Sequence, residues 1–244
     1  MRIAISGPAN SGKTTLIREF INTWPKYVTP VESYRNILAE KQLEHSMNTT
    51  EETQEIILDY MIKQLKQYEN KSHIIYDRCP LDVLVYTLVA CEENKVSDEF
   101  TAKIIDKVRE SLHLLDAIFV LPYNENIPIE NNGIRETNLD YIRYTDSVFQ
   151  ELVQHYQTEF DTSVFFPSTN CPGIISFETD DYIKEIKYML NQDGDLYSQE
   201  DEIKMQEDFA KAISEMKKNK ELLERVISNQ EALMPQVDIS NLKI

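Results

Sequence analysis

Residues 7–15 read Gly-Pro-Ala-Asn-Ser-Gly-Lys-Thr-Thr and are the most informative part of the chain. It fits the pattern G-x-x-x-x-G-K-[ST], a loop whose backbone N–H groups surround the phosphates of a nucleotide. The apolar run at residues 2–6 predicts a buried strand before the loop, and a helical pattern begins at Lys13. Because a helix presents its positive end to bound phosphates, the order strand, loop and helix predicts a site for a nucleoside triphosphate.

The residues of this phosphate loop have separate predicted tasks. We expect Lys13 to reach the β- and γ-phosphates of ATP, and the Thr14 hydroxyl to bind Mg²⁺. The other predicted ATP-binding residues are Gly7, Asn10, Ser11, Gly12 and Thr15. A glycine-rich turn without function is the alternative, and the strand and helix on either side argue against it.

The charge of the chain restricts its partners. Its 244 residues carry a net charge of −17, which argues against extended nucleic acid and anionic membranes as partners. Residues 1–30, however, contain four cationic side chains and one carboxylate. This part therefore has a net charge of +3, and the remaining residues have a net charge of −20. Three cysteines without zinc-site spacing predict free thiols in the cytoplasm. A strand at the very N-terminus leaves no room for a signal peptide, and no apolar run could span a bilayer.

Apolar runs alternate with helical patterns over residues 1–194, which predicts one α/β domain with a parallel sheet covered by helices. Strands are predicted at residues 2–6, 27–31, 73–77, 117–121 and 174–178. Helices are predicted to begin at Lys13, near Val31, near Thr50, and at Leu81, Ser97, Leu139 and Asp180. An irregular patch at residues 160–173 could contain a further strand at 163–166.

Residues 195–244 form a C-terminal extension of different character. Residues 198–234 lack Gly and Pro, and their apolar residues recur at three- and four-residue steps, which predicts a long, acidic amphipathic helix. Its apolar face could cover the α/β domain of the same chain or pair with a second copy in a homodimer. A stripe of ~3–4 turns is short for a coiled coil, which favours the first alternative.

The strand predicted at residues 73–77 ends in Asp77, and Arg78 follows it. A carboxylate there can hold Mg²⁺ beside the phosphate loop, and the arginine can reach the phosphates or the acceptor. Asp82 begins the next helix, where it is either an acceptor ligand or an N-terminal cap.

Glu32 follows the strand predicted at residues 27–31, on the edge of a parallel sheet where ligands bind. Its carboxylate could accept a proton from a hydroxyl group or hydrogen-bond a sugar. Arg35 lies one helical turn later. The alternative is an ordinary surface ion pair between Glu32 and Arg35.

Two further arginines belong to a predicted lid at about residues 123–145. Arg135 lies in a loop that contains Gly133, and Arg143 lies on the helix that follows. Arginines on mobile segments neutralise a phosphoryl group in transfer, and the closed segment excludes water. Solvated surface arginines are the alternative.

With these motifs the chain resembles the P-loop nucleoside and nucleotide kinases, most closely the AAA branch that includes the ribosylnicotinamide kinase domain. The resemblance covers about residues 1–190 and rests on four stretches, at residues 7–14, 31–35, 77–82 and 133–135. It implies a three-layer, doubly wound sheet of five parallel strands. It also implies that ATP with Mg²⁺ donates a phosphoryl group to a nucleoside or nucleoside monophosphate. Cys79 and residues 195–244 depart from the pattern.

Two other functions remain open on the sequence. A kinase that acts on a polynucleotide or on a modified base in DNA would share the ATP site, although the acidic composition counts against it. A P-loop ATPase or switch could instead act through the C-terminal helix. Such a switch needs a residue that positions a water molecule, and the sequence assigns none.

Overall fold

The computed structural model describes most of the chain. The described residues are 1–31, 34–41, 43, 46–129, 136–159, 162–177 and 179–198, with single positions at 201, 203, 207 and 211. For residues 34, 35 and 37 only the backbone is described. The chain divides into two compact units, Met1–Asp195 and Leu196–Ile244, one residue away from the predicted domain boundary. The long helix predicted at residues 198–234 lies almost entirely outside the described residues.

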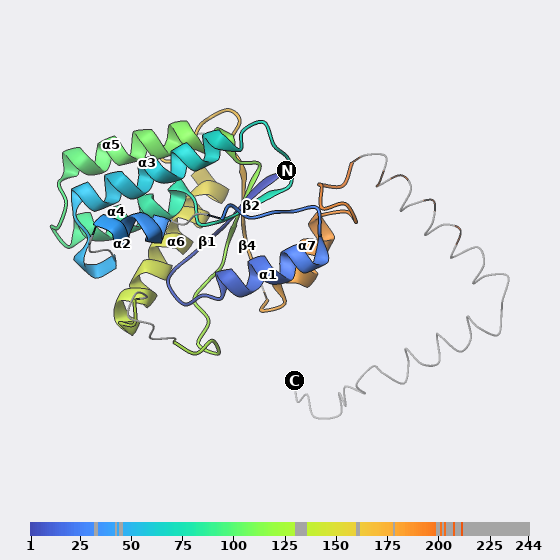
Figure 1. The fold of residues 1–244 in the computed structure, drawn as a ribbon, viewed down its shortest axis with the longest axis horizontal. Coiled ribbons are helices and arrows are strands. Elements are labelled where there is room, and N and C mark those ends of the chain that lie inside the picture. The colour runs from blue at the N-terminus through green and yellow to red at the C-terminus, as the bar shows by residue number, and fades with distance from the viewer. Residues whose placement is uncertain are drawn as a thin grey trace, which may run out of the picture. The chain divides into compact units, whose positions relative to one another are not determined.

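The first unit is built on a parallel sheet, as predicted. Its strands are β1 (Arg2–Ser6), β2 (Ile74–Asp77), β3 (Ala117–Val120) and β4 (Gly173–Ser176). They lie in the order β2-β1-β3-β4, and each neighbouring pair is parallel. Because β1 is central, the loop that follows it begins in the middle of the sheet (Figure 1).

The prediction of five strands is wrong by one. Residues 27–31 make a single parallel bridge, between Val28 and Ile74, instead of a strand. The Val28 N–H donates to the His73 carbonyl, and its own carbonyl accepts from Ile75, each at 3.0 Å. Pro30 has no N–H with which to extend this ladder, so the pairing stops. Residues 163–166 do not form a strand either.

The helices begin within three residues of the predicted starts. They are α1 (Lys13–Thr23), α2 (Tyr34–Lys41), α3 (Glu51–Gln67), α4 (Pro80–Glu92), α5 (Asp98–Ser111), α6 (Leu139–Glu159) and α7 (Tyr182–Met189). The side chains of Thr50 and Ser97 cap α3 and α5, each by accepting a hydrogen bond from the backbone N–H three residues later. Such capping residues made these helix starts predictable from the sequence. None of the described helices is long and apolar enough to cross a membrane.

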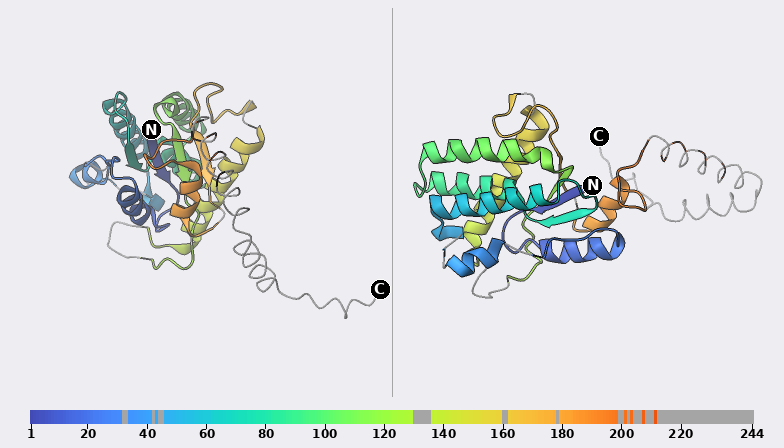
Figure 2. Two further views of the ribbon diagram at one scale, coloured as in Figure 1. Left: turned by 90° about the vertical axis from the view of Figure 1, so that its right-hand side faces the viewer. Right: turned by 45° about the horizontal axis from the view of Figure 1, so that its top comes forward.

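Helices cover both faces of the sheet, which confirms the three-layer prediction. Strand residues alternate between two cores: Ala4 and Tyr76 face one, and Ile3, Ile5 and Ile75 face the other. The first core is completed by α3, α4, α5 and α6, and the second by α1 and α7. Figures 1 and 2 show α1 and α7 together on one side of the sheet, with the larger helical layer on the other.

The last loop of the first unit is fastened to the end of α1. The Trp24 indole N–H donates to the Asn191 carbonyl at 2.9 Å, and the Tyr27 hydroxyl donates to the Gly194 carbonyl at 2.6 Å. Gly194 has a φ of 85°, and a Cβ on it would lie 2.7 Å from the Tyr27 ring. Glycine is therefore required where the chain passes this aromatic pair.

Candidate active site

A cavity of about 410 Å³ lies where β1 and β2 end. Its walls come from the phosphate loop and first turn of α1, the end of β2, one face each of α3 and α4, and residues near 127 and 136. Its volume falls within the usual range for small-molecule sites, about 300–1,000 Å³. The site is therefore assembled from segments that lie far apart in the sequence.

The phosphate loop has the backbone that its sequence predicts. Gly7, Asn10 and Gly12 have φ values of 136°, 57° and 83°. A Cβ on Gly7 would overlap the carbonyl oxygen of Leu121, so only glycine fits this turn. The other predicted ATP-binding residues, Asn10, Ser11, Gly12, Lys13, Thr14 and Thr15, all line the cavity.

Lys13 is held inside the phosphate loop. Its Nζ donates to the Gly7 carbonyl at 2.9 Å, to Ser11 Oγ at 3.0 Å and to the Pro8 carbonyl. The residue is buried and begins α1, so the ammonium group and the positive end of the helix share one place. This combination is suited to an anion such as a triphosphate.

Two oxygen-bearing side chains line the cavity beside the loop. Thr14 lies on the exposed side of the first turn of α1, and Asp77 ends β2 in register with Ile5. Mg²⁺ prefers hydroxyl and carboxylate oxygens, and it is commonly held by one or two protein groups together with substrate phosphates. Within the described part of the chain, no group of three or more His, Cys, Asp or Glu could form an all-protein metal site. The residues present therefore fit Mg²⁺ bound with a nucleotide.

Arg78 is buried next to the phosphate loop. Its Nη1 donates to the Gly7 carbonyl at 3.1 Å and to Asp82 Oδ1 at 2.5 Å. Its guanidinium carbon lies 5.5 Å from the centre of the Tyr86 ring. A φ of 76°, uncommon for a residue with a Cβ, turns the chain from β2 toward α4 at this position.

Asp82 acts as a helix cap in the structure. Its Oδ2 accepts from the Cys79 backbone N–H at 3.0 Å and from Ser6 Oγ at 2.7 Å. Cys79 is the N-cap of α4, and the two residues form a capping box. Burial, together with the Asp82 charge, raises the pKa of the Cys79 thiol to about 12. All three cysteines are free thiols, as predicted.

The structure adds residues that the sequence analysis did not select. Gln54, Ile57 and Met61 of α3 face Val83 and Tyr86 of α4 across the cavity. Gln54 is 3% exposed, and its Nε2 donates to Thr49 Oγ1 at 2.9 Å. The sequence contained a signal that could have identified this wall. Gln54, Ile57 and Met61 are spaced by three and four residues, so the polar Gln54 lies on the apolar face of the predicted helix.

Two residues of the predicted lid, Ile127 and Glu136, lie against the phosphate loop. Ile127 approaches Gly12 so closely that a Cβ on the glycine would lie 2.9 Å from Ile127 Cδ1. Asn10 Nδ2 donates to the Glu136 carbonyl at 2.9 Å. The predicted lid residue Arg135 lies outside the described residues.

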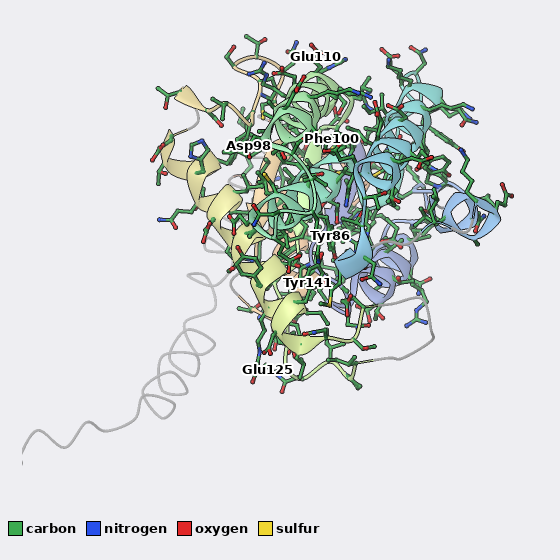
Figure 3. All side chains as sticks on the ribbon, turned by 90° about the vertical axis from the view of Figure 1, so that its left-hand side faces the viewer. Tyr86, Asp98, Phe100, Glu110, Glu125 and Tyr141 are labelled. Carbon is green, nitrogen blue, oxygen red and sulfur yellow. The ribbon has the colours of Figure 1, made fainter. Side chains whose placement is uncertain are left out.

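The remaining predicted residues are not brought to the cavity by the described structure. Arg143 forms an ion pair with Glu125, with 2.6 Å between Nη2 and Oε1, and stacks near the Tyr123 ring. The Tyr86 and Tyr141 rings lie next to each other in the helical layer. Figure 3 shows both residues, with Glu125 farther out at the edge of the molecule. Glu32 and the side chain of Arg35 lie outside the described residues.

Comparisons with known proteins agree with this architecture. A family model described as an AAA domain matches residues 2–162, about two thirds of the chain. No curated protein matches the chain. A structure of deoxyadenosine kinase from M. mycoides, with dCMP and dCDP bound, is 21% identical and has a TM-score of 0.54. The match covers 73% of this chain and 90% of that one.

Two further structures have similar folds. NadR in complex with NR is 16% identical with a TM-score of 0.51, and the match covers 79% of this chain and 48% of NadR. Thymidylate kinase from Candida albicans is also 16% identical with a TM-score of 0.51, over 81% of this chain and 94% of that one. At these identities the likeness shows the fold, which is that of the P-loop nucleoside kinases.

Proposed function

We propose, since the chain belongs to the AAA domain family and has a P-loop nucleoside kinase fold, that it transfers the γ-phosphate of ATP to a nucleoside or a nucleoside monophosphate. One observation carries the proposal: a single cavity joins the phosphate loop to an apolar compartment between α3 and α4. Phosphoryl transfer requires the donor phosphate and the acceptor hydroxyl to meet in a fixed geometry. In this proposal the two substrates would occupy adjacent parts of the cavity.

The loop end of the cavity suits the triphosphate. Lys13 and the N-terminus of α1 place positive charge where the bridging and γ-oxygens would gain negative charge during transfer. Bound Mg²⁺ would neutralise charge on the β- and γ-phosphates, and Thr14 and Asp77, which line the cavity, would hold it. Arg78 adds a second cation at the same end.

The other end suits a flat, mainly apolar group with a polar edge. Ile57, Met61 and Val83 supply apolar surface, and Tyr86 supplies a ring. The Gln54 amide can present both a donor and an acceptor to the edge of a base. Two structural neighbours, deoxyadenosine kinase and thymidylate kinase, are named for nucleoside and nucleotide substrates, which supports the same class here.

Three residues whose side chains lie outside the described structure complete the proposal. Glu32 would accept the proton of the acceptor hydroxyl, and Arg35 would bind the acceptor beside it. Arg135 would neutralise the transferring phosphoryl group. Arg135 directly precedes Glu136, whose carbonyl is bonded to Asn10 of the phosphate loop, and this proximity supports its role. Arg143 would join them only after leaving its ion pair with Glu125.

One labelling experiment tests the proposal against its alternatives. The full chain is incubated with γ-labelled ATP and Mg²⁺, and separately with nucleosides, nucleoside monophosphates, and oligonucleotides with and without modified bases. We expect label on a nucleoside or a monophosphate. Label on an oligonucleotide would replace the proposal with a polynucleotide or modified-base kinase, and release of inorganic phosphate alone would indicate an ATPase.

A further inference from the structure

The position of the Arg78 guanidinium is determined by groups on three different segments. Arg78 follows β2, the carbonyl oxygen that it contacts belongs to Gly7 of the phosphate loop, and the carboxylate that it contacts belongs to Asp82 of α4. The backbone of Arg78 is left-handed, with a φ of 76°, a conformation that persists in a non-glycine residue only when the surrounding contacts stabilise it. The arginine is therefore held in one position at the junction of donor loop and acceptor compartment.

Asp82 provides the charged contact in this arrangement. The residue is 1% exposed, and both of its carboxylate oxygens have partners. Oδ1 accepts from Arg78, while Oδ2 accepts from Ser6 Oγ and the Cys79 N–H. These bonds fix the carboxylate to the end of β1 and the start of α4 at once.

This geometry separates two roles that the sequence left open for Asp82. Asp82 lines the cavity, but a carboxylate that directly binds an acceptor hydroxyl should have an exposed oxygen, whereas Asp82 is 1% exposed and both of its oxygens already accept from protein donors. A buried carboxylate and guanidinium also depend on each other, because removal of one leaves the other charged and without its counter-ion. Any effect of Asp82 on a substrate should therefore pass through Arg78.

We propose that Asp82 is a positioning residue, which holds the Arg78 guanidinium between the phosphate loop and the acceptor compartment so that phosphoryl transfer can occur. The inference rests on the proposed function, because it concerns the same cavity. A cation stabilises developing charge most effectively when it is already in place before the reaction. Without the Asp82 carboxylate, Arg78 would keep its charge but lose its fixed direction.

The test is a double-mutant cycle on the full chain, with wild type, Asp82→Asn, Arg78→Ala and the double variant. Asparagine keeps the size of the side chain and an acceptor oxygen but removes the charge. Asp98→Asn is the matched control, because Asp98 is an acidic residue in the first turn of α5 and does not line the cavity. The measurements are kcat, the acceptor KM, the ATP Kd without acceptor, and Tm.

We expect Asp82→Asn to lower kcat about tenfold, the size of effect expected when a charge-assisted hydrogen bond is lost. The same substitution in the Arg78→Ala background should change kcat by less than about twofold, because residues that act as one unit have non-additive effects. Asp98→Asn should match the wild type in kcat.

Either of two results with Asp82→Asn would overturn the inference. One is an equal loss from Asp82→Asn in both backgrounds, which would mean that Asp82 acts independently of Arg78. The other is a wild-type kcat in a folded Asp82→Asn protein. If Asp82→Asn does not fold at the assay temperature, Arg78→Lys replaces it. Lysine keeps the charge but cannot reproduce the planar contact, so a wild-type rate in that variant would also overturn the inference.

Failure of the proposed function gives a different result. In that case the wild type labels no nucleoside or monophosphate, while the four proteins can still be compared through their ATP Kd values. Non-additive losses of ATP binding would support the Asp82–Arg78 unit, and additive or absent losses would overturn it.

Discussion

Gly7 turns the chain from β1 into the phosphate loop with a φ of 136°, and its α-carbon lies against the backbone of Leu121. Both features exclude a side chain: an L-residue is strained at this φ, and a Cβ would overlap the carbonyl oxygen of Leu121, the residue that follows β3. The clash is with backbone, which cannot move aside as a flexible side chain can.

We therefore expect Gly7→Ala to destabilise the fold by at least about 2 kcal/mol and to abolish ATP binding. Thermal unfolding and ATP titration measure the two effects. Gly173→Ala is the control, because a Cβ there would meet only Ile175 Cδ1, at an ordinary 3.9 Å. A Gly7→Ala protein that binds ATP like the wild type would contradict this description of the loop.

We expect Lys13 to contribute to the rate of the reaction more than to the stability of the fold. Its ammonium group lies among the loop carbonyls at the N-terminus of α1, where it would meet the β- and γ-phosphates. We expect Lys13→Ala to lower kcat/KM by roughly 10²–10⁴, the usual range for a lost cation of this kind. Steady-state kinetics measure it, with the exposed Lys66→Ala as control. Near-normal turnover by a folded Lys13→Ala protein would remove Lys13 from the mechanism.

At the scale of single residues, the sequence is most informative where the chemistry demands a fixed spacing. The phosphate loop was predictable because backbone N–H groups, a lysine and a hydroxyl must occupy set positions around a phosphate. For Asp82 the sequence offered a cap or an acceptor ligand. Deciding between them needs the positions of Ser6 and Arg78, which the order of residues does not contain.

At the scale of elements, α3 contributes a whole wall of the cavity. Its inner face carries Gln54, Ile57 and Met61, which follow one another at helical spacing. Gln54 is the polar member of this wall, and its amide is already oriented by Thr49. The helix thus combines apolar surface with one hydrogen-bonding group whose direction is fixed.

We expect Gln54→Leu to raise the acceptor KM about tenfold, since an unpaired polar contact costs on the order of 1–3 kcal/mol, and to leave the ATP Kd unchanged. Separate titrations with acceptor and ATP measure the two constants. Gln67→Leu is the matched control, because Gln67 is exposed on the same helix and outside the cavity. Equal weakening of acceptor and ATP binding would place Gln54 outside the acceptor compartment.

Each helix predicted within residues 1–194 is present, whereas one predicted strand is not, and the difference has a physical reason. A helix satisfies its own backbone, so caps such as Thr50 and Ser97 mark it locally. A strand depends on a neighbour, and residues 27–31 have only β2 on one side. Their apolar pattern looked like that of the other strands, but Pro30 limited the pairing to a single bridge.

For the whole first unit, we expect one carboxylate, Asp146, to lower stability at neutral pH. Asp146 on α6 is half-buried, and burial raises its pKa above the ordinary value. Its Oδ1 accepts from the Tyr123 N–H at 3.0 Å, a bond that an amide oxygen could also accept. Because the folded protein holds the Asp146 proton more tightly than the unfolded chain, this group contributes stability at low pH that is lost as pH rises through its folded pKa.

We therefore expect Asp146→Asn to raise Tm at pH 7, where roughly 2–4 °C corresponds to about 1 kcal/mol in a chain of this size. The difference should disappear below the ordinary aspartate pKa of about 3.9, where the carboxyl is protonated in both states. Thermal unfolding between pH 3 and pH 8 measures it. Asp140→Asn is the control, an exposed acid in the first turn of the same helix that should gain nothing. If the Tm of Asp146→Asn minus the Tm of the wild type were smaller at pH 7 than at pH 4, the prediction would be contradicted.

The fastening of residues 191–195 to Trp24 and Tyr27 has a mechanical consequence. The first unit ends at Asp195, and this loop is bonded to the residues that follow α1. Helix α1 has 11 residues. At 1.5 Å per residue it forms a stiff rod about 16 Å long. Tension applied to the chain beyond Asp195 would load the C-terminal end of this rod, whose other end holds Lys13 and the phosphate loop.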